Sequence, residues 1–276
     1  MSSFAAAAGA APDVLREEID SRAHRAQPID HAVPNLFVVP AYNEEANLPR
    51  LFADLESRPE LFPEGSRLLI VDDGSQDDTA AIVDRYQGPL PAEVIRLGHN
   101  QGPGAAFRAG FAAALDSCNG EALVVTLEAD TTSDLDALPE MIRCAYTGAE
   151  LVLASWVMVN VSRFRRTLSG GAALVINRIL GVDAKTVSSF YRVYRASTLR
   201  AAAARYGDAL IREPGFACKA ELLSKLSSMA VRIEEVDVSL DSSRRVGESK
   251  MPVLKTIFHY WRLMARQRFA RDPIAA

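Results

Sequence analysis

The sequence has few cysteines and no excess of charge of one sign, and each shortage excludes a class of protein. Cys118, Cys144 and Cys218 are its three cysteines in 276 residues. Their spacing fits neither a zinc site nor a disulfide framework, so we expect free thiols in a reducing compartment. The formal net charge of -4 gives no reason to expect nucleic-acid binding.

The sequence also lacks a long apolar run. No stretch reaches the roughly 18–20 residues that a membrane-spanning helix needs. The longest, residues 151–161, contains Ser155 and Asn160 and is better explained as a buried strand with the loop that follows. Residues 1–11 are rich in alanine but have no basic region, so they do not predict a signal peptide. We expect a cytoplasmic protein, with peripheral attachment to the inner face of a membrane left open.

What the sequence does contain is ample material for a core. Apolar residues make up 49% and charged residues 24%, a balance typical of globular domains. Residues 1–32 are small and polar and predict a flexible extension. Residues 33–243 predict one large domain, and residues 244–276 predict a basic loop followed by an amphipathic helix.

Short apolar runs alternate with helical patterns from residue 35 onward. The runs predict strands at residues 36–39, 68–71, 94–97, 123–127 and 151–154. The helix after the second strand is expected to begin with a capping box of Ser75 and Asp78 and to run through Tyr86. Strand–helix alternation with short connections predicts an α/β fold, with a mostly parallel sheet covered by helices on both faces. Ligands of such sheets bind beyond the carboxyl ends of the strands.

Acidic clusters follow three of the expected strands. Residues 40–45 offer an aromatic ring for a base and a carboxylate for ribose, although the same residues would also cap a helix. Residues 72–75 have two adjacent carboxylates, at least one of which must face a cleft, unless they only form a tight turn. Residues 128–130 have carboxylates suited to a divalent cation, although capping residues follow them. Three such clusters on one rim favour a site for a cation or for sugar hydroxyls.

Six segments, in this order, resemble glycosyltransferase family 2, and most closely its polyprenyl- and dolichyl-phosphate mannosyl- or glucosyltransferases. They are VVPAYNEEANLP (38–49), LLIVDDGSQDDT (68–79), LGHNQGPGAAFRAGF (97–111), VVTLEAD (124–130), SSFYRVYR (188–195) and RRVGESKM (244–251). Each segment alone is loose, but the ordered set is specific. The resemblance implies a GT-A fold and an inverting transfer of a hexose from a nucleotide-diphosphate sugar, a GDP- or UDP-hexose.

The resemblance also implies roles for individual residues. The wall that holds the nucleoside is expected to consist of Pro40, Tyr42, Glu44, Val71 and Asp73. Glu128, Ala129 and Asp130 stand where the family contacts the diphosphate and Mg²⁺ or Mn²⁺. Thr132 stands at the position of a further metal ligand.

Two basic residues, Arg244 and Lys250, resemble the pair on the family's flexible loop that closes over the phosphates. We expect them to act with Asp130 in catalysis, because cations that arrive with loop closure stabilise a leaving diphosphate.

Several residues depart from the family pattern. Glu128 replaces an aspartate, Thr132 a glutamine and Trp156 an arginine. Residues 189–191 differ from the small-residue turn of the close relatives, and Gly170 replaces another arginine. Several of these positions are on the acceptor side, so the sugar-nucleotide half of the prediction has the stronger support.

The acceptor is therefore the open question. No acid is marked as a general base, and the Gln-x-x-Arg-Trp segment of processive synthases is absent. Both absences favour a phosphate acceptor such as a polyprenyl-phosphate lipid, because a phosphate needs no base. One alternative is a soluble enzyme acting on a small hydroxyl acceptor. The other is a protein with weakened catalysis that only binds sugar nucleotides.

The C-terminal segment bears on the same question. Residues 250–271 include six basic residues and no acid, with apolar residues at helical spacing. A helix of this kind can lie in a membrane interface, or it can pack on the catalytic domain or on a second subunit in a homo-oligomer.

Overall fold

In a computed structural model of the chain, the structure describes residues 32–118, 120–157, 181–182, 184–187, 189–239 and 253–269. Three expectations fall outside these ranges. They concern the N-terminal extension up to residue 31, Gly170, and the basic loop with Arg244 and Lys250.

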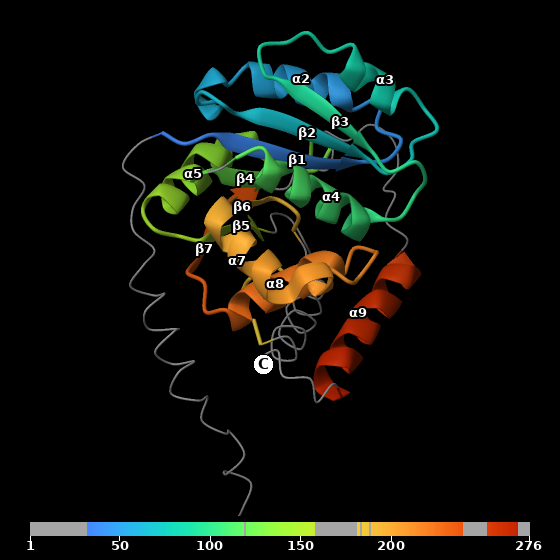
Figure 1. Cartoon of the computed structure of the whole chain (residues 1–276), viewed down its shortest axis with the longest axis vertical. Coiled ribbons are helices and arrows are strands. Elements are labelled where there is room, and N and C mark those ends of the chain that lie inside the picture. Colours follow the sequence, from blue (N-terminus) through green and yellow to red (C-terminus); the bar gives the residue numbers. More distant parts are fainter. Residues whose placement is uncertain are drawn as a thin grey trace, which may run out of the picture.

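Within the described residues, seven strands form one sheet in the order β3-β2-β1-β4-β6-β5-β7 (Figure 1). The strands are β1 (Asn35–Ala41), β2 (Arg67–Asp72), β3 (Ala92–Arg96), β4 (Leu123–Thr126), β5 (Leu151–Val157), β6 (Arg192–Arg195) and β7 (Ile233–Ser239). All neighbouring strands are parallel except that β6 runs antiparallel to β4 and β5. The expected α/β class with a mostly parallel sheet is therefore confirmed.

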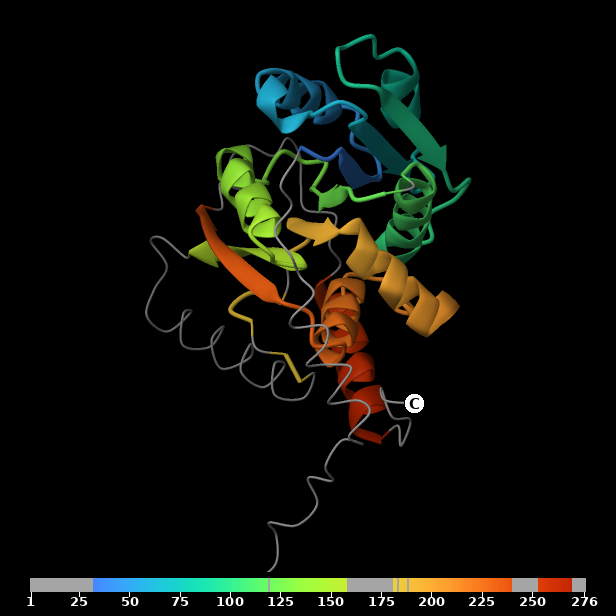
Figure 2. The same ribbon diagram turned by 60° about the vertical axis from the view of Figure 1, so that its left-hand side comes forward.

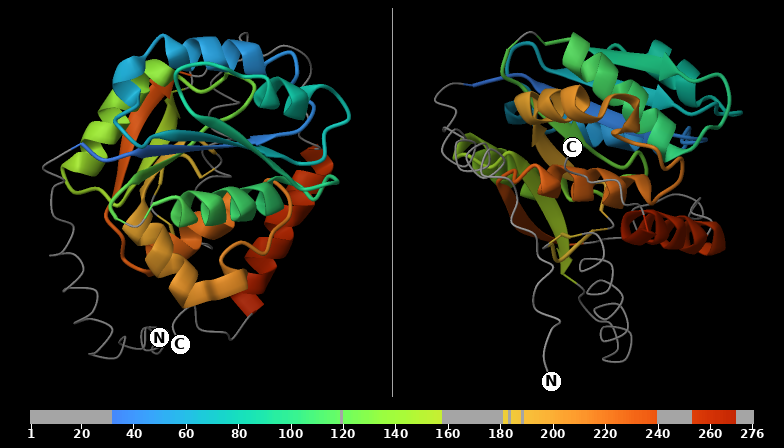
Figure 3. Two further views of the ribbon diagram at one scale, coloured as in Figure 1. Left: turned by 45° about the horizontal axis from the view of Figure 1, so that its top comes forward. Right: turned by 60° about the horizontal axis from the view of Figure 1, so that its bottom comes forward.

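Helices cover both faces of this sheet (Figure 3). They are α2 (Leu48–Glu56), α3 (Thr79–Asp84), α4 (Pro103–Asp116), α5 (Leu138–Tyr146), α7 (Ala196–Tyr206), α8 (Cys218–Ser228) and α9 (Val253–Phe269), with short 3₁₀ turns η1 (Pro59–Leu61), η2 (Leu135–Ala137) and η3 (Gly207–Ala209). Side chains of α2, α3 and α5 form one buried cluster with the sheet, and those of α4, α7, α8 and α9 form another. Alternate residues of β1 point into the two clusters, with Phe37 in the first and Val38 in the second. This alternation follows from the two-residue period of a strand.

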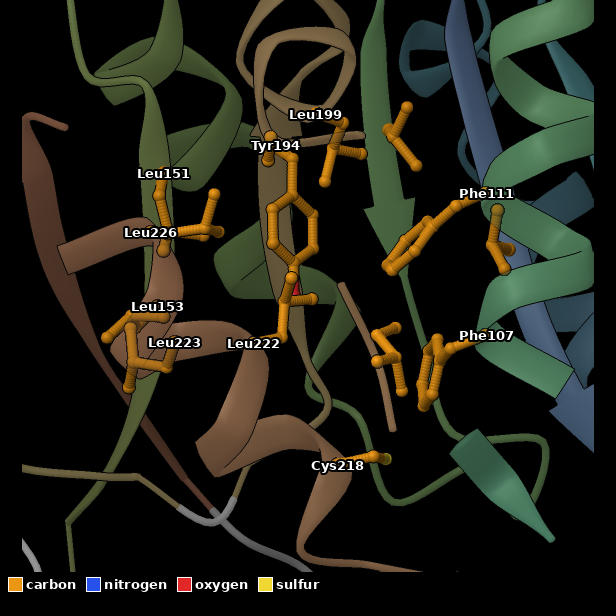
Figure 4. Close-up of a cluster of buried hydrophobic side chains, with 14 of the residues drawn as sticks. Phe107, Phe111, Leu151, Leu153, Tyr194, Leu199, Cys218, Leu222, Leu223 and Leu226 are labelled. Carbon is orange, nitrogen blue, oxygen red and sulfur yellow. The ribbon is translucent and has the colours of Figure 1, made fainter. Parts of the chain in front are cut away.

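The second cluster fixes α4 against the sheet. Phe107 and Phe111 of α4 pack with each other, and Phe111 meets Tyr194 of β6 edge-on at 5.5 Å between ring centroids (Figure 4). A Cβ atom on Gly110 would lie 2.3 Å from Cγ1 of Val38. Glycine therefore allows the helix to approach β1 closely, and the start of α4 has a rigid position at the edge of the sheet.

The expected capping box at Ser75 is wrong. The helix begins four residues later, at Thr79, and ends at Asp84, before Tyr86. Asp78 occupies the N-cap position without a side-chain capping bond. The hydroxyl of Ser75 instead accepts a hydrogen bond from the backbone N–H of Asn43 at 2.9 Å, so the neighbouring loop uses the oxygen that the helix was expected to use.

The three cysteines are free thiols, as expected. None of the helices in the described ranges has the length and apolar character needed to span a membrane.

Candidate active site

The candidate site lies at the edge of the sheet where β1, β2 and β4 end. Because β6 is antiparallel, with Arg192 opposite Thr126, the residues before β6 join the same edge. Three loops from the carboxyl ends and one from an amino end therefore meet there, which agrees with the expected position of a ligand site.

The loops after β1 and β2 hold each other through their backbones. The N–H of Asn43 donates to Ser75, and that of Glu44 donates to the hydroxyl of Thr79 at 2.7 Å. In the reverse direction, the N–H of Gln76 donates to the side-chain oxygen of Asn43 at 2.8 Å. Asn43 has a φ of 54°, a left-handed conformation that asparagine tolerates better than most residues. The polar residues of the first cluster thus fasten one loop to the other.

The expected nucleoside wall is largely buried at this edge. Pro40 and Tyr42 are half-buried, whereas Val71 is fully buried in the core below the edge. The carboxylate of Glu44 is also buried and accepts a hydrogen bond from Nδ2 of Asn47 at 2.7 Å. The structure brings these residues together, and their contact with a nucleoside stays a prediction.

Asp73 holds a third loop in place. Its two carboxylate oxygens accept hydrogen bonds from the N–H groups of Gln101, at 2.7 Å, and Gly102, at 2.8 Å. Burial raises the pKa of the Asp73 carboxyl, and these two bonds oppose the rise. Gly74 beside it has a φ of 74°, and a Cβ atom there would lie 2.4 Å from Cα of His99. The loop before α4 therefore rests directly on the Asp73–Gly74 turn.

The third acidic cluster lies just beyond β4. Glu128 accepts a hydrogen bond from the hydroxyl of Ser133, and Asp130 accepts one from the hydroxyl of Thr132 at 2.6 Å. Directly after Asp130, Thr131 has a φ of 63°, which is rare for a β-branched residue. The hydroxyls of Thr132 and Ser133 thus hold the two carboxylates within one tight turn after β4.

The two carboxyl groups of this cluster influence each other. Burial raises the pKa of Glu128, the hydrogen bond from Ser133 opposes the rise, and the negative charge of Asp130 adds to it. No group of three or more His, Cys, Asp or Glu side chains gathers in the described part of the chain. Two mutually repelling carboxylates nevertheless fit Mg²⁺ or Mn²⁺, which typically takes one or two protein carboxylates together with phosphate oxygens and water. The roles of Ala129 at the diphosphate and of Thr132 at the metal stay predictions.

The structure adds a lysine that the sequence did not point to. Lys219 of α8 lies over the ring of Phe190, with Nζ 4.1 Å from its centroid, and 5.6 Å from that of Phe216. Burial lowers the pKa of Lys219 to about 8, and the nearby charge of Glu128 opposes this effect. No local pattern marks Lys219, since it reaches the edge only because α8 packs beneath the residues before β6.

Phe190, Tyr191 and Trp156, three described residues at which the chain departs from the expected family pattern, lie on this same side of the edge. Phe190 packs on Phe107 of α4 at 4.7 Å between centroids. The hydroxyl of Tyr191 donates to the carbonyl of Asp134 at 2.9 Å. Trp156 lies near the end of β5, half-buried. β7 also ends at this edge, and the segment with Arg244 and Lys250 follows it outside the described residues.

Comparisons with known proteins agree with this geometry. Residues 36–205 match the sequence model of Glycosyl transferase family 2. The chain is 32% identical over 222 residues to the undecaprenyl-phosphate mannosyltransferase of Micrococcus luteus, covering 78% of this chain and 86% of that protein. It is 31% identical to an undecaprenyl-phosphate 4-deoxy-4-formamido-L-arabinose transferase of Pseudomonas syringae, covering 59% of this chain and 48% of that one. The chain thus spans about half the length of the second relative.

Solved structures resemble the chain in fold. Glucosyl-3-phosphoglycerate synthase from Mycobacterium tuberculosis, in complex with Mn²⁺, UDP and phosphoglyceric acid, superposes with a TM-score of 0.61 at 18% identity. The match covers 94% of this chain and 84% of the synthase. The same enzyme with Mn²⁺, UDP and glucosyl-3-phosphoglycerate gives a TM-score of 0.59 at 19% identity, covering 91% and 81%. These likenesses confirm the expected GT-A fold.

Proposed function

Because the chain belongs to glycosyl transferase family 2 and is therefore a glycosyltransferase, we propose that it transfers a hexose from a nucleotide-diphosphate sugar to a polyprenyl-phosphate lipid. The observation that carries this proposal is the 32% identity across 86% of an undecaprenyl-phosphate mannosyltransferase. A soluble small-molecule acceptor is the second candidate, favoured by the fold of a synthase whose complexes contain phosphoglyceric acid.

In this proposal the interlocked loops hold the nucleoside. Tyr42 offers its ring for stacking on the base, and Glu44 offers a carboxylate for polar contacts. The loop fixed by Asp73 closes the third side, since both oxygens of that carboxylate are bonded to its backbone. Such a site is formed before the ligand arrives, which lowers the entropic cost of binding.

Glu128 and Asp130 would hold the divalent cation, which neutralises charge on the leaving diphosphate. The acceptor oxygen attacks the anomeric carbon from the side opposite the diphosphate, so the configuration inverts. A phosphate acceptor is already an anion at neutral pH and needs no general base. Arg244 and Lys250 are proposed to reach the phosphates from the loop after β7 and to stabilise the charge that develops there.

Helix α9 supports a lipid acceptor. Among the described residues, the large apolar side chains that are exposed all belong to α9: Ile257 (60%), Phe258 (55%) and Trp261 (62%). Such side chains are usually scattered singly, and a cluster marks an interaction surface. The helix also carries four basic residues and no acid. Two of the four pair with Glu213, and the positive charge of the other two suits an anionic membrane surface.

The opposite face of α9 packs on the catalytic domain, beside α8 (Figure 2). His259 and Leu263 are buried there. Arg262 and Arg266 both pair with the fully buried carboxylate of Glu213, at 2.6 and 2.8 Å. The neighbour of Glu213, Pro214, accepts a hydrogen bond from Gly104 at the start of α4. Packing on the domain and lying on a membrane are therefore compatible, and we propose peripheral attachment through the exposed face.

One assay tests the proposed reaction. The protein is incubated with radiolabelled GDP- or UDP-hexoses, Mn²⁺ and undecaprenyl phosphate in vesicles, and the product is extracted into organic solvent. We expect label in the organic phase only with acceptor, metal and one class of donor. Label found only on a water-soluble acceptor would favour the second candidate. Absence of both transfer and metal-dependent donor hydrolysis would favour a protein that only binds nucleotides.

A further inference from the structure

Two positively charged residues, Lys219 of α8 and Arg192 of β6, lie together at the sheet edge. We call this part of the edge, formed by α8 and the residues before β6, the acceptor side. Within the described ranges, neither Lys219 nor Arg192 takes part in an ion pair. Arg192 is fully buried, and its guanidinium donates to the carbonyl oxygens of Lys219 and Val187, both at 3.0 Å. Its Nε has no hydrogen-bond partner. A buried charge normally has a counter-charge, so this pair is unusual.

The nearest negative charge does not balance the two cations. Glu128 is close enough for its charge to act on Lys219, yet it forms no ion pair with it. In addition, Glu128 is expected to share a divalent cation with Asp130, which would add positive charge. The part of the edge formed by α8 and the start of β6 thus carries two positive charges and, among the described residues, no ion pair that balances them.

The rings around Lys219 fix where its ammonium group lies. Phe190 and Phe216 both contact it, and Phe190 is itself held against Phe107 of α4. Rings can hold a cation through their faces, but they do not neutralise it. The ammonium group is therefore positioned in advance and its charge is left for a ligand.

We propose that Lys219, backed by Arg192, binds the phosphate group of the acceptor. The donor diphosphate is expected over Glu128 and Asp130, next to the nucleoside wall of β1 and β2. Lys219 lies toward β6 and α8, beside Phe190 and Arg192, and we assign this side of the edge to the acceptor. This inference rests on the proposed function for the identity of the acceptor, and it adds the residue that recognises the acceptor's charge.

The transfer balances with a phosphate held in this way. One oxygen of the acceptor monoester dianion forms a bond to the anomeric carbon, and the bond from that carbon to the diphosphate breaks. The nucleoside diphosphate leaves with the electron pair as a trianion, and the product is a phosphodiester monoanion. No proton moves. Lys219 would hold an oxygen that does not attack, which orients the acceptor without blocking its nucleophile.

The test compares Lys219→Gln, which removes the charge, with Lys219→Arg, which keeps it. Lys185→Gln is the matched control, because Lys185 is an exposed lysine that pairs with Asp237 on the surface. Binding of farnesyl phosphate, farnesol and 3-phosphoglycerate is measured calorimetrically without donor. Initial rates with undecaprenyl phosphate then give separate KM values for acceptor and donor.

We expect Lys219→Gln to weaken farnesyl phosphate binding and to raise the acceptor KM by about 10- to 100-fold, the usual effect of losing one charged hydrogen bond. The donor KM should stay within about two-fold, because the donor phosphates are expected at Glu128 and Asp130 and not at Lys219. Lys219→Arg and Lys185→Gln should bind nearly as the parent does. Farnesol binding should not respond to any of the variants. If 3-phosphoglycerate replaces farnesyl phosphate as the Lys219-dependent ligand, the phosphate site stands and its source is a small molecule.

Two results would overturn the site. One is an unchanged acceptor KM in a folded Lys219→Gln variant that still transfers sugar to a lipid phosphate. The other is an equal loss of donor and acceptor binding with a lowered melting temperature, which indicates a structural role. By contrast, Lys219-dependent phosphate binding without any sugar transfer would support the site and refute the proposed function.

Discussion

The two sides of the sheet edge handle charge in opposite ways. On the nucleoside side, the polar groups of the loops after β1 and β2 are bonded to backbone groups of the neighbouring loop. On the acceptor side, Lys219 lies near Glu128 and forms no ion pair among the described residues. On the nucleoside side, polar residues hold the loops in place. On the acceptor side, the charge of Lys219 has no ion-pair partner among the described residues and can bind a ligand.

This difference indicates how each side should respond to substitution. Where polar groups hold loops together, their loss should first lower the free energy of unfolding. Where charges lack partners, their loss should first lower affinity or rate and leave stability almost unchanged. A substitution that reversed this order on either side would refute the distinction.

The largest expected effect concerns Asp130→Asn. The substitution removes one of the two carboxylates proposed to hold the metal, so kcat/KM should fall on the order of 10²–10³-fold at fixed Mn²⁺. The melting temperature should change little, because the described contacts of Asp130 are to its own turn. Initial rates and thermal melts check both points. Glu93→Gln, at an exposed position of β3, is the control, and an Asp130→Asn enzyme with parental rates would contradict the metal assignment.

A smaller effect, on stability, is expected from Gly74→Ala on the nucleoside side. Gly74 and Gly98 both have positive φ, 74° and 78°, but only at Gly74 would a Cβ atom meet backbone, at 2.4 Å. Gly98→Ala should cost about 1 kcal/mol for the left-handed conformation. Gly74→Ala should cost about 3 kcal/mol, because overpacking adds to that strain. Urea unfolding measures the difference, and equal losses would show that the third loop does not rest on this turn.

The smallest effect on the folded protein is expected from the double substitution Phe258→Ser and Trp261→Ser. Both side chains are more than half exposed, so the free energy of unfolding should change by less than about 0.5 kcal/mol. Binding to phosphatidylglycerol vesicles should nevertheless fall about 10-fold or more. Co-sedimentation measures it, with Gln87→Ser, at another exposed position, as the control. Unchanged vesicle binding together with a shift from dimer to monomer would assign the face to a second copy of the chain.

The sequence was sufficient for strands β1 to β5 and for placing the first two acidic clusters at one edge, whereas the contact of those clusters with a nucleoside stays a prediction. Continuous apolar runs such as residues 36–39 and 68–71 predict buried parallel strands, and acidic residues directly after them must lie at one edge. The assignment of Ser75 failed because a capping pattern does not reveal that another loop will bind the same hydroxyl first. Local spacing cannot anticipate a competing partner that is distant in the chain.

The acceptor side could not be anticipated in the same way. The antiparallel direction of β6 depends on pairing between β4 and β5, and it is this direction that brings Phe190 to the edge. Lys219 comes from a helix that follows later still, and its neighbours in sequence, Cys218 and Ala220, are ordinary core residues. Lys219 and Arg192 therefore come together only through tertiary packing.

The pairing of Glu213 with two arginines of α9 has a practical consequence for anyone shortening the chain. A C-terminal basic helix with an apolar face is a natural candidate for removal when a membrane-binding protein is made easier to handle. Here truncation before α9 would remove both Arg262 and Arg266, which pair with the fully buried carboxylate of Glu213. Leaving a buried charge uncompensated typically costs about 3–5 kcal/mol. Recoding the exposed side chains is the safer way to obtain a version that stays in solution.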